Sequence, residues 1–479
     1  MSMLRALLPP HFLPSFTRHV SVRHHSVATG PLPGDKIFVA LSSGLDSTVS
    51  ASLLLRSHPP ENLYPIYLQN WAPSQHPPPA AAALGPFGKP LAPNTETSSK
   101  PGQQQQPKCI DREFARVREI CAHLRLPNEP RLLQFEKEYW NDVFAPMLSS
   151  YEKGDTPNPD VGCNREIKFG ALARRIGAEI AGGERWWLAT GHYARAVGGR
   201  LLRSGDPGKD QTYFLSTVPA EVLQRCVFPL GDAGLVKSQV KEIARKLEVP
   251  GWREGEMTRE SFGLCFVEPA GGRNSGFRRF LGEYLPPAPG NIVVGESRET
   301  WPDGAPILMP PPGTVVAKHE GLWHATVGEK AHLQLPQGSL AFQGRWYVSR
   351  KNPEKNQIEV VKGGNNRALF SRAMAVGDWR WLGDDAEKIA TAKRPDEAPA
   401  APAGGSVWEP GLVAQFRHLQ KPLKVKAVTV LGDGKGPGTR RVSIVFDTPQ
   451  KAVTVGQSAA MWDGERCLGG GVIDDTEPV

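Results

Sequence analysis

The sequence predicts an N-terminal α/β domain with a doubly wound, mostly parallel sheet. A small β-rich central domain and a C-terminal β-barrel-like domain are expected to follow. Residues 37–41 form a short, continuous apolar run of the kind that builds a buried parallel strand, and a helical pattern and a second strand follow it. The 479 residues exceed one domain at roughly 100–200 residues per domain. After about Pro250, turns rich in glycine and proline alternate with short strand patterns.

The elements of the first domain follow one another as strands and helices, which favours an α/β sheet with its ligand at the strand ends. We expect strands at residues 37–41, 64–69, 132–135 and 187–190, and helices at 48–56, 110–124, 139–151 and 235–247. A polar loop over residues 154–164 is expected to precede a helix that begins near Arg165. Beyond Pro250, short strands are expected at residues 314–317, 346–348, 358–361, 425–430 and 442–446.

Composition places the domain boundaries. We expect the α/β domain over residues 31–250, a central domain over 251–345 and a barrel domain over 346–479. Residues 73–108 and 384–405, rich in Pro, Ala and polar residues, are expected to be insertions, and the first of them disordered.

The N-terminal segment and the net charge indicate the location of the protein in the cell and the class of its binding partner. Residues 1–30 contain arginines and serines but no carboxylate, which is typical of a mitochondrial transit peptide and predicts the matrix as destination; a disordered cytosolic tail is the alternative. No apolar run approaches the ~20 residues of a membrane span, so no membrane partner is expected. The net charge of +8 suits a polyanionic partner.

The first chemical motif is the loop that follows the first strand. It reads Ala40, Leu41, Ser42, Ser43, Gly44, Leu45, Asp46 and Ser47. Backbone N–H groups at a helix start favour phosphate, and the serine hydroxyls can add donors. The loop lacks the GxxxxGK[ST] pattern of a Walker loop. An ordinary serine-rich turn that caps a helix is the alternative.

Two of the six cysteines stand in suggestive settings. Cys163 follows a stretch with two prolines and precedes the helix expected near Arg165, where a helix N-terminus and an arginine would stabilise a thiolate. Cys265 lies two residues after Gly263 in apolar surroundings. Each cysteine taken alone is more often a buried structural thiol. None of the six forms a CxxC pair, so no zinc site is expected.

Taken together and in order, these segments are specific. SSGLDS (42–47), NPDVGCN (158–164), GHYAR (191–195), KDQTYFLS (209–216), FPLG (228–231) and GLCF (263–266) resemble the motifs of the tRNA-specific 2-thiouridylases, which belong to the PP-loop ATP pyrophosphatases. The resemblance runs from about Lys36 to Ile473. Ser43 stands where the family's loop usually has glycine.

The resemblance implies a nucleotide site and its cofactors. Residues 40–47 would cradle the phosphates of ATP, with Leu68 and Gly191 near the adenine and ribose. Mg²⁺ would come with ATP, and no metal site made of protein ligands alone is expected. ATP is needed because the oxygen at C2 of uracil is a poor leaving group until it is adenylated.

The resemblance also implies roles for the two cysteines. Cys265 would carry sulfur as a persulfide, and Cys163 would be the nucleophile that either releases sulfide from it or resolves the product by forming a disulfide with Cys265. Asp46 completes the expected catalytic set. The sulfur would come from a donor or relay protein downstream of a cysteine desulfurase.

The implied substrate is the wobble uridine of mitochondrial tRNA. Asn158, Pro159 and Asp160 align with the segment that faces the target base. The positions aligned with tRNA contacts are His192, Lys209, Asp210, Gln211, Arg417, His418 and Gln457. A proline-rich turn with side-chain capping is the alternative for the first segment.

Two other functions stay open on the sequence. Another PP-loop enzyme with an amine nucleophile, such as a lysidine synthetase, would not need the cysteine pair. A tRNA-binding protein without catalysis would not consume ATP.

Overall fold

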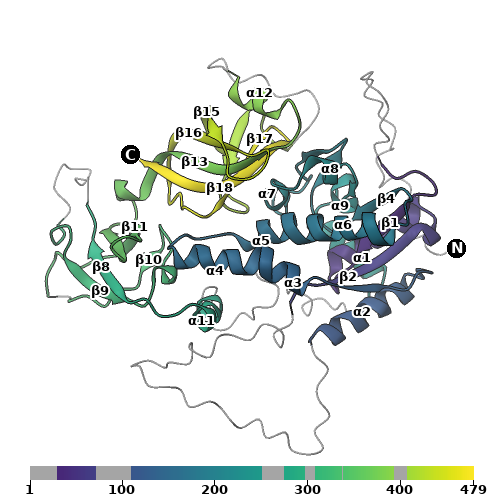
Figure 1. Cartoon of the computed structure of the whole chain (residues 1–479), viewed down its shortest axis with the longest axis horizontal. Helices are drawn as coiled ribbons and strands as arrows, with labels where there is room; N and C mark the ends of the chain where they lie inside the picture. Colours follow the sequence, from purple (N-terminus) through teal and green to yellow (C-terminus); the bar gives the residue numbers. More distant parts are fainter. Residues whose placement is uncertain (1–29, 72–108, 251–274, 297–307, 337, 393–406) are drawn as a thin grey trace, which may run out of the picture.

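The computed structural model describes residues 30–71, 109–250, 275–296, 308–336, 338–392 and 407–479. The N-terminal domain, the central sheet and the C-terminal barrel are three separate bodies in Figure 1, with the barrel lying over long helices that run from the N-terminal domain toward the central sheet. The predicted transit peptide, the insertion at 73–108 and Cys265 lie outside the described residues.

The N-terminal domain is built on a five-stranded sheet of order β3-β2-β1-β4-β7. Its strands are β1 (Lys36–Ala40), β2 (Leu63–Gln69), β3 (Arg131–Gln134), β4 (Trp186–Ala189) and β7 (Cys226–Val227). Every pairing in it is parallel. The predicted parallel sheet is therefore confirmed, with β1 at its centre.

Helices cover both faces of this sheet because successive residues of a strand point to opposite sides. Ile37 and Val39 pack with α1 (Leu45–Ser57) and α2 (Cys109–His123). Phe38, between them, packs against the opposite layer. That layer comprises α3 (Glu136–Tyr139), Trp140–Phe144, α4 (Ala145–Glu152), α5 (Pro159–Gly162), Cys163–Ala171, α6 (Leu172–Arg175) and Ile176–Ile180, of which the three unlabelled stretches are π-helical.

Shorter elements complete this domain. They are the 3₁₀ turn Pro60–Asn62 and the helices α7 (Thr212–Leu215), α8 (Ala220–Leu223), α9 (Pro229–Asp232) and α10 (Lys237–Lys246). Helix α10 packs against α1 through Val240, Ala244 and Val49. No helix in the described part of the chain is long and apolar enough to cross a membrane.

The central domain is a five-stranded sheet of order β10-β11-β12-β8-β9. It contains α11 (Ser275–Tyr284), β8 (Gly290–Val294), β9 (Val315–His319), the 3₁₀ turn Leu322–His324, β10 (Lys330–Ala331), β11 (Trp346–Asn352) and β12 (Gln357–Lys362). The boundary expected between residues 345 and 346 needs correction, because β11 and β12 pair within this sheet. The sheet ends at Lys362 and the barrel begins at Phe370.

The C-terminal domain is a closed barrel of six strands. The order is β13-β16-β15-β14-β17-β18, and β18 pairs back with β13. The strands are β13 (Phe370–Trp381), β14 (Leu412–Gln415), β15 (Leu423–Asp433), β16 (Arg440–Lys451), β17 (Ser458–Asp463) and β18 (Arg466–Pro478), preceded by the 3₁₀ turn Arg367–Leu369. Part of the expected insertion at 384–405 is ordered helix, α12 (Ala386–Thr391), whose buried Ala386 and Ala390 pack on the barrel core.

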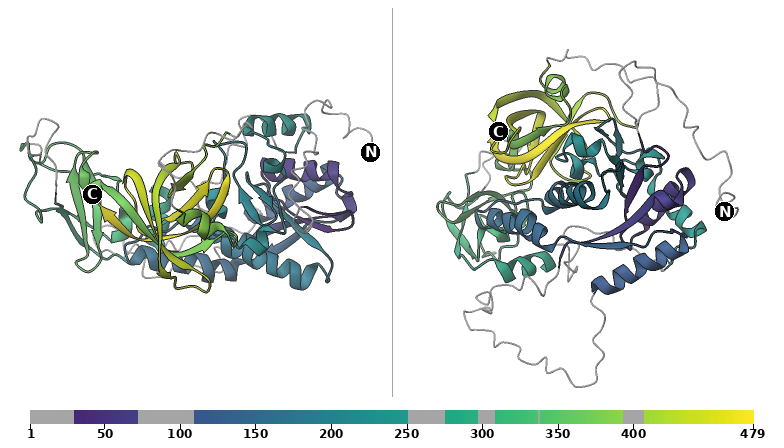
Figure 2. Two further views of the ribbon diagram at one scale, coloured as in Figure 1. Left: turned by 90° about the horizontal axis from the view of Figure 1, so that it is seen from above. Right: turned by 45° about the vertical axis from the view of Figure 1, so that its right-hand side comes forward.

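The N-terminal domain and the barrel share a core. The hairpin of β5 (Arg195–Val197) and β6 (Arg200–Leu202) leaves the first domain and pairs with β18. Trp462 and Cys467 of the barrel belong to the same buried cluster as Phe169 of the N-terminal domain. Both views in Figure 2 show the barrel lying directly against the N-terminal domain. Burial on this scale fixes the two domains relative to each other.

Candidate functional site

The loop between β1 and α1 is held in shape by its own side chains. Ser47 Oγ accepts a hydrogen bond from the N–H of Ser42 at 3.2 Å and lies 3.0 Å from the carbonyl oxygens of Ser42 and Gly44. Gly44 is the N-cap of α1 and supplies no side-chain hydrogen bond to the first turn. The N–H groups at this helix start therefore remain suited to an anionic ligand, as the sequence predicts.

Three parallel strands bring the predicted nucleotide residues to one edge. The loop 40–47 follows β1, Leu68 lies near the end of β2, and Gly191 follows β4, and both outer strands pair with β1. A Cβ on Gly191 would lie 2.8 Å from the backbone nitrogen of Ser47, so only glycine fits there. The carboxyl ends of parallel strands are where α/β sheets bind ligands.

Asp46 has two partners that the sequence analysis did not identify. Lys237 Nζ lies 2.8 and 2.7 Å from the two carboxylate oxygens, and the hydroxyl of Tyr193 donates to Oδ1 at 3.0 Å. Lys237 is the first residue of α10, and its N–H donates to Asp206. Tyr193 lies in the GHYAR motif, which is a local signal, whereas nothing in the sequence around Lys237 points to Asp46.

The helix that carries Cys163 begins earlier than predicted. It starts at Pro159 instead of near Arg165, because Asn158 caps it by accepting from the N–H groups of Asp160 and Val161 at 3.2 and 3.4 Å. Pro159 at the first position is preorganised for a helix start. Cys163 is therefore inside the helix, one turn beyond its N-terminus, and the stabilisation of a thiolate by the helix end is weaker than expected.

Cys163 nevertheless lies beside the carboxyl end of β2. Its side chain is buried, and Asn70 Nδ2 donates toward its Sγ at 4.0 Å. Asn70 directly follows β2, the strand next to β1, so this contact brings the cysteine beside the strand ends that carry the loop. Asn70 Oδ1 and Asn164 Oδ1 are buried without a hydrogen-bond partner among the described residues. Sequence reasoning missed both amides.

The target-base segment is partly structural. Asn158, besides capping the helix, donates from Nδ2 to the hydroxyl of Tyr213 at 3.5 Å. Asp160 lies in the first turn, and burial raises the pKa of its carboxyl, opposed by the charge of Lys168. These contacts bear out the capping alternative without removing either residue from the neighbourhood of Cys163.

The residues predicted to contact tRNA divide into two groups. Lys209, Arg417 and His418 gather beside α7: the His418 ring lies 4.3 Å from that of Phe214, and burial, with the charge of Lys209, lowers the pKa of His418 to about 4. Arg417 is exposed and bonds to the carbonyl of Ala452. The contact of this group with tRNA stays a prediction.

The second group makes polar contacts within the protein, although only Asp210 among its members is buried. Asp210 is 5% exposed and pairs with Arg203 at 3.2 Å. Gln211 accepts from the N–H of Tyr193 at 2.9 Å. His192 contacts the Thr190 hydroxyl at 2.8 Å, and burial lowers its pKa to about 3. Gln457 donates to the carbonyl of Thr156 at 2.8 Å. Their described contacts hold the fold, and their contact with tRNA stays a prediction.

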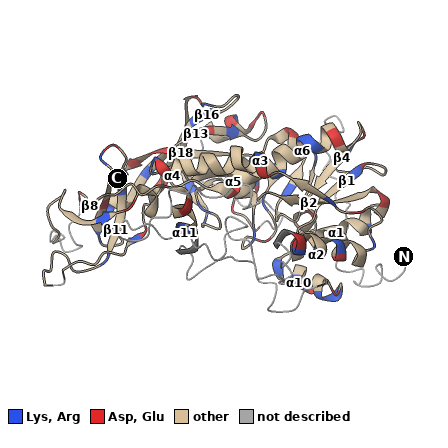
Figure 3. Cartoon of the chain, turned by 60° about the horizontal axis from the view of Figure 1, so that its bottom comes forward, with Lys and Arg blue, Asp and Glu red and all other residues tan. Residues whose placement is uncertain are grey.

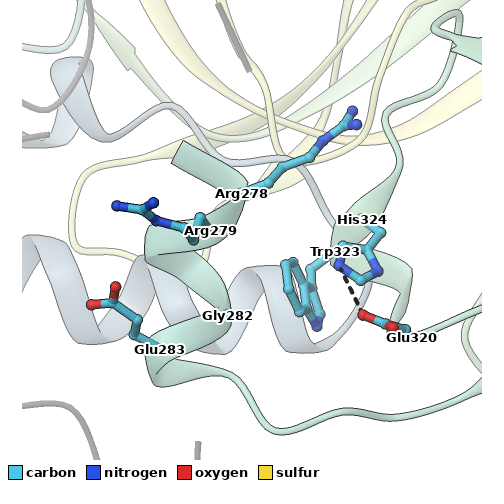
Figure 4. Close-up of a pocket in the computed structure, with 7 residues that line it drawn as sticks. All are labelled: Arg278, Arg279, Gly282, Glu283, Glu320, Trp323 and His324. Carbon is cyan, nitrogen blue, oxygen red and sulfur yellow. Dashed lines mark ion pairs between the residues drawn. The ribbon is translucent and has the colours of Figure 1, made fainter. Parts of the chain in front are cut away.

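Charge and cavities give little further guidance. Figure 3 shows basic and acidic stretches mixed along the helices. A shallow pocket of about 360 Å³ lies between α11 and the segment around Trp323, and its lining includes both basic and acidic side chains (Figure 4). Among the described residues no cluster of three or more His, Cys, Asp or Glu could hold a metal ion.

Comparison with known proteins gives a consistent picture. Residues 92–269 match the tRNA methyl transferase HUP domain, 278–362 its PRC-barrel domain and 371–473 the aminomethyltransferase beta-barrel domain. The limits 278–362 and 371–473 agree with the change of sheet after Lys362.

Whole-chain relatives extend the match. The mitochondrial tRNA-specific 2-thiouridylase 1 of Saccharomyces cerevisiae is 33% identical over 92% of this chain and 92% of its own length. The Schizosaccharomyces pombe protein of the same name is 34% identical over 95% and 94%. The tRNA-specific 2-thiouridylase of Alcanivorax borkumensis is 36% identical over 71% and 79%. With identities of 33–34% over more than nine tenths of both chains, the chain belongs to the tRNA-specific 2-thiouridylase family.

Proposed function

We propose that the protein is an ATP-dependent sulfurtransferase that replaces the 2-oxygen of the wobble uridine in mitochondrial tRNAs with sulfur. The observation that carries the proposal is the convergence at one sheet edge: the uncapped start of α1 follows β1, and Cys163 contacts Asn70 at the end of the neighbouring β2. Such an edge can hold a nucleotide and a nucleophile side by side. The names of the relatives supply the substrate class.

The loop 40–47 would bind the phosphates of ATP, with Leu68 and Gly191 beside the nucleoside. Lys237, which pairs with Asp46 of this loop, is a cation that would stabilise the negative charge of the phosphates. Mg²⁺ would screen that charge. The uracil O2 attacks the α-phosphorus of ATP and pyrophosphate leaves, so that C2 then carries AMP as a leaving group.

Sulfur arrives in this proposal as a persulfide on Cys265. Either the Cys163 thiolate attacks Sγ of Cys265, which breaks the bond to the terminal sulfur and expels hydrosulfide that displaces AMP from C2, or the terminal persulfide sulfur displaces AMP and Cys163 then attacks Sγ of Cys265 to release the thiolated base. Both routes end with 2-thiouridine, AMP and a Cys163–Cys265 disulfide, whose two electrons must be returned by a thiol reductant before the next cycle. A desulfurase-linked relay protein supplies the sulfur.

The test is reconstitution with unmodified tRNA, ATP, Mg²⁺ and a persulfide donor, followed by mass spectrometry of the nucleosides. The chain should form 2-thiouridine and AMP in equal amounts. Cys163→Ser and Cys265→Ser should abolish thiolation, while Cys121→Ala, in the core of α2, should retain it. Full thiolation by Cys163→Ser would favour an enzyme with another nucleophile, and no ATP consumption with tRNA present would favour a binding protein.

The destination can be tested separately. We infer a mitochondrial location from residues 1–30 and from the two fungal relatives, both named mitochondrial. Fusing residues 1–30 to a fluorescent reporter should direct it to the matrix. A cytosolic reporter would contradict this assignment and leave the chemistry untouched.

A further inference from the structure

The short segment in front of the Cys163 helix is held by the two other domains. The N–H of Thr156 donates to the carbonyl of Val455 at 3.0 Å, and the carbonyl of Thr156 accepts from Gln457 Nε2 at 2.8 Å. Both backbone groups of this one residue are thus paired with the loop that leads into β17 of the barrel. Paired backbone groups define position more sharply than apolar contact does, because hydrogen bonds are directional.

The barrel loop approaches the backbone of Thr156 so closely that only glycine fits at position 456. Gly456 has a φ of +91°, and a Cβ there would lie 2.7 Å from the backbone nitrogen of Thr156. The hydroxyl of Tyr213 makes a second link, because it donates to the carbonyl of Ser458 at 2.9 Å and accepts from Asn158. The cap of the Cys163 helix is therefore tied to the same loop.

The central sheet holds the segment from another side. Lys351 on β11 donates from Nζ to Thr156 Oγ1 at 3.2 Å, to the carbonyl of Asp155 at 3.4 Å and to the carbonyl of Ala325 at 3.0 Å. Burial lowers the pKa of this amine to about 8, with Asp155 and Glu329 opposing the shift. Three domains thus meet on Thr156.

The chain between Thr156 and Cys163 is stiff enough to transmit a displacement. Pro157 and Pro159 have fixed φ angles, Asn158 caps the helix, and residues from Pro159 onward are helical. A shift of Thr156 must therefore move the whole start of the helix, and with it the thiol.

We propose that Thr156 is a positioning residue, held by Gln457 and Gly456 of the barrel and Lys351 of the central sheet, through which these domains set the place of the Cys163 thiol. The inference rests on the proposed function, since it gives Cys163 a chemical role. The barrel then contributes to the rate of sulfur transfer through the placement of the nucleophile, in addition to any contact with RNA.

Gly456→Ala tests this, with Gly464→Ala as the matched control. Gly464 lies on the same barrel with a φ of +56°, but an added Cβ there meets nothing within 4 Å. Both variants place a side chain at a positive φ, where an L residue is strained. Only the first pushes on Thr156.

Two quantities are measured on the full chain: kcat and KM for tRNA in the thiolation assay, and the rate at which Cys163 reacts with methyl methanethiosulfonate without tRNA, followed by peptide mass spectrometry. Gly456→Ala should lower kcat by about a hundredfold, as expected for a misplacement near 1 Å. It should also change the Cys163 reaction rate severalfold. Gly464→Ala should leave both unchanged.

Equal behaviour of the two glycine variants would overturn the inference. If Gly456→Ala does not fold, Gln457→Leu decides, because it removes the Nε2 donor without crowding the backbone; an unchanged Cys163 reaction rate without tRNA then refutes the proposal. Failure of the proposed function is distinguishable, since it would appear as full thiolation by Cys163→Ser.

Discussion

Replacing Asp210 by alanine would remove the partner of a buried guanidinium at the contact between the N-terminal domain and the barrel. Arg203 is 1% exposed and lies between the rings of Trp408 and Trp462, at 4.1 and 4.0 Å from their centroids. Its NH2 group also donates to Gln415 of the barrel at 3.0 Å. Asp210 additionally accepts from the N–H of Ser204 at 2.9 Å and from the Thr212 hydroxyl at 2.7 Å.

The loss of stability in Asp210→Ala comes from the buried Arg203 guanidinium that remains without its carboxylate partner. Breaking a buried ion pair by removing one partner typically costs about 3–5 kcal/mol, because the remaining charge stays out of water. The two indole rings attract the cation equally in the parent chain and in Asp210→Ala, so they do not compensate for the lost carboxylate. We expect Asp210→Ala to weaken the association of the hairpin β5–β6 with the barrel by about 3–5 kcal/mol.

Hydrogen exchange measured by mass spectrometry suits a chain of several domains, for which one global unfolding energy is not defined. Peptides covering β6 and β17 should exchange about 10²–10⁴ times faster in Asp210→Ala. Adding Arg203→Met should restore part of the protection, because the unpaired charge is gone. Glu477→Ala is the control, since both side chains of its pair with Arg372 are more than half exposed and such a pair should contribute under about 1 kcal/mol.

A change below 1 kcal/mol for Asp210→Ala, or no recovery in the double variant, would refute the reasoning. The same variant separates structure from recognition. If Asp210 instead contacts tRNA, as its alignment implies, Asp210→Ala should change tRNA affinity while β6 and β17 stay protected.

Three further outcomes follow from the site. Gly191→Ala should weaken ATP binding about tenfold to hundredfold in calorimetry, because its Cβ would crowd the nitrogen of Ser47; unchanged affinity would separate this contact from the nucleotide site. The pKa of His192 is lowered from 6.5 to about 3 in the folded protein. Between these pH values the unfolded chain binds more protons at this residue than the folded chain does. The contribution of His192 to stability is therefore present above pH 6.5 and falls as the pH drops toward 3. His192→Asn should therefore lose less stability between pH 6.5 and 4 than the parent, by at most ~1.4 kcal/mol per pH unit, in thermal unfolding; parallel curves would contradict this. Asn158→Ala should cost about 0.5–2 kcal/mol as a lost helix cap, and Asn158→Asp should recover most of it; equal losses in both would show that the cap is not what the side chain supplies.

Local pattern was enough to predict the frame of the nucleotide site. The apolar run of β1, the small residues after it and the helix that follows are neighbours in the chain, so the loop 40–47 could be recognised directly. Leu68 and Gly191 were expected near the nucleotide only through the resemblance to the family, and the parallel pairing of β2 and β4 with β1 places both at the same edge. Periodicity also predicted α2 and α10 to within a few residues.

Tertiary structure alone decided the partners of these residues. Lys237 meets Asp46, Arg203 meets Gln415, and Lys351 and Gln457 meet Thr156, across separations in sequence that leave no local pattern. The membership of β11 and β12 in the central sheet was hidden for the same reason, since a strand's residues indicate its two faces and not its neighbour. The sequence alone thus indicated which residues are expected to take part in chemistry. Packing between domains determined which of these residues are held in position, which are paired with an opposite charge and which are buried in structural ion pairs.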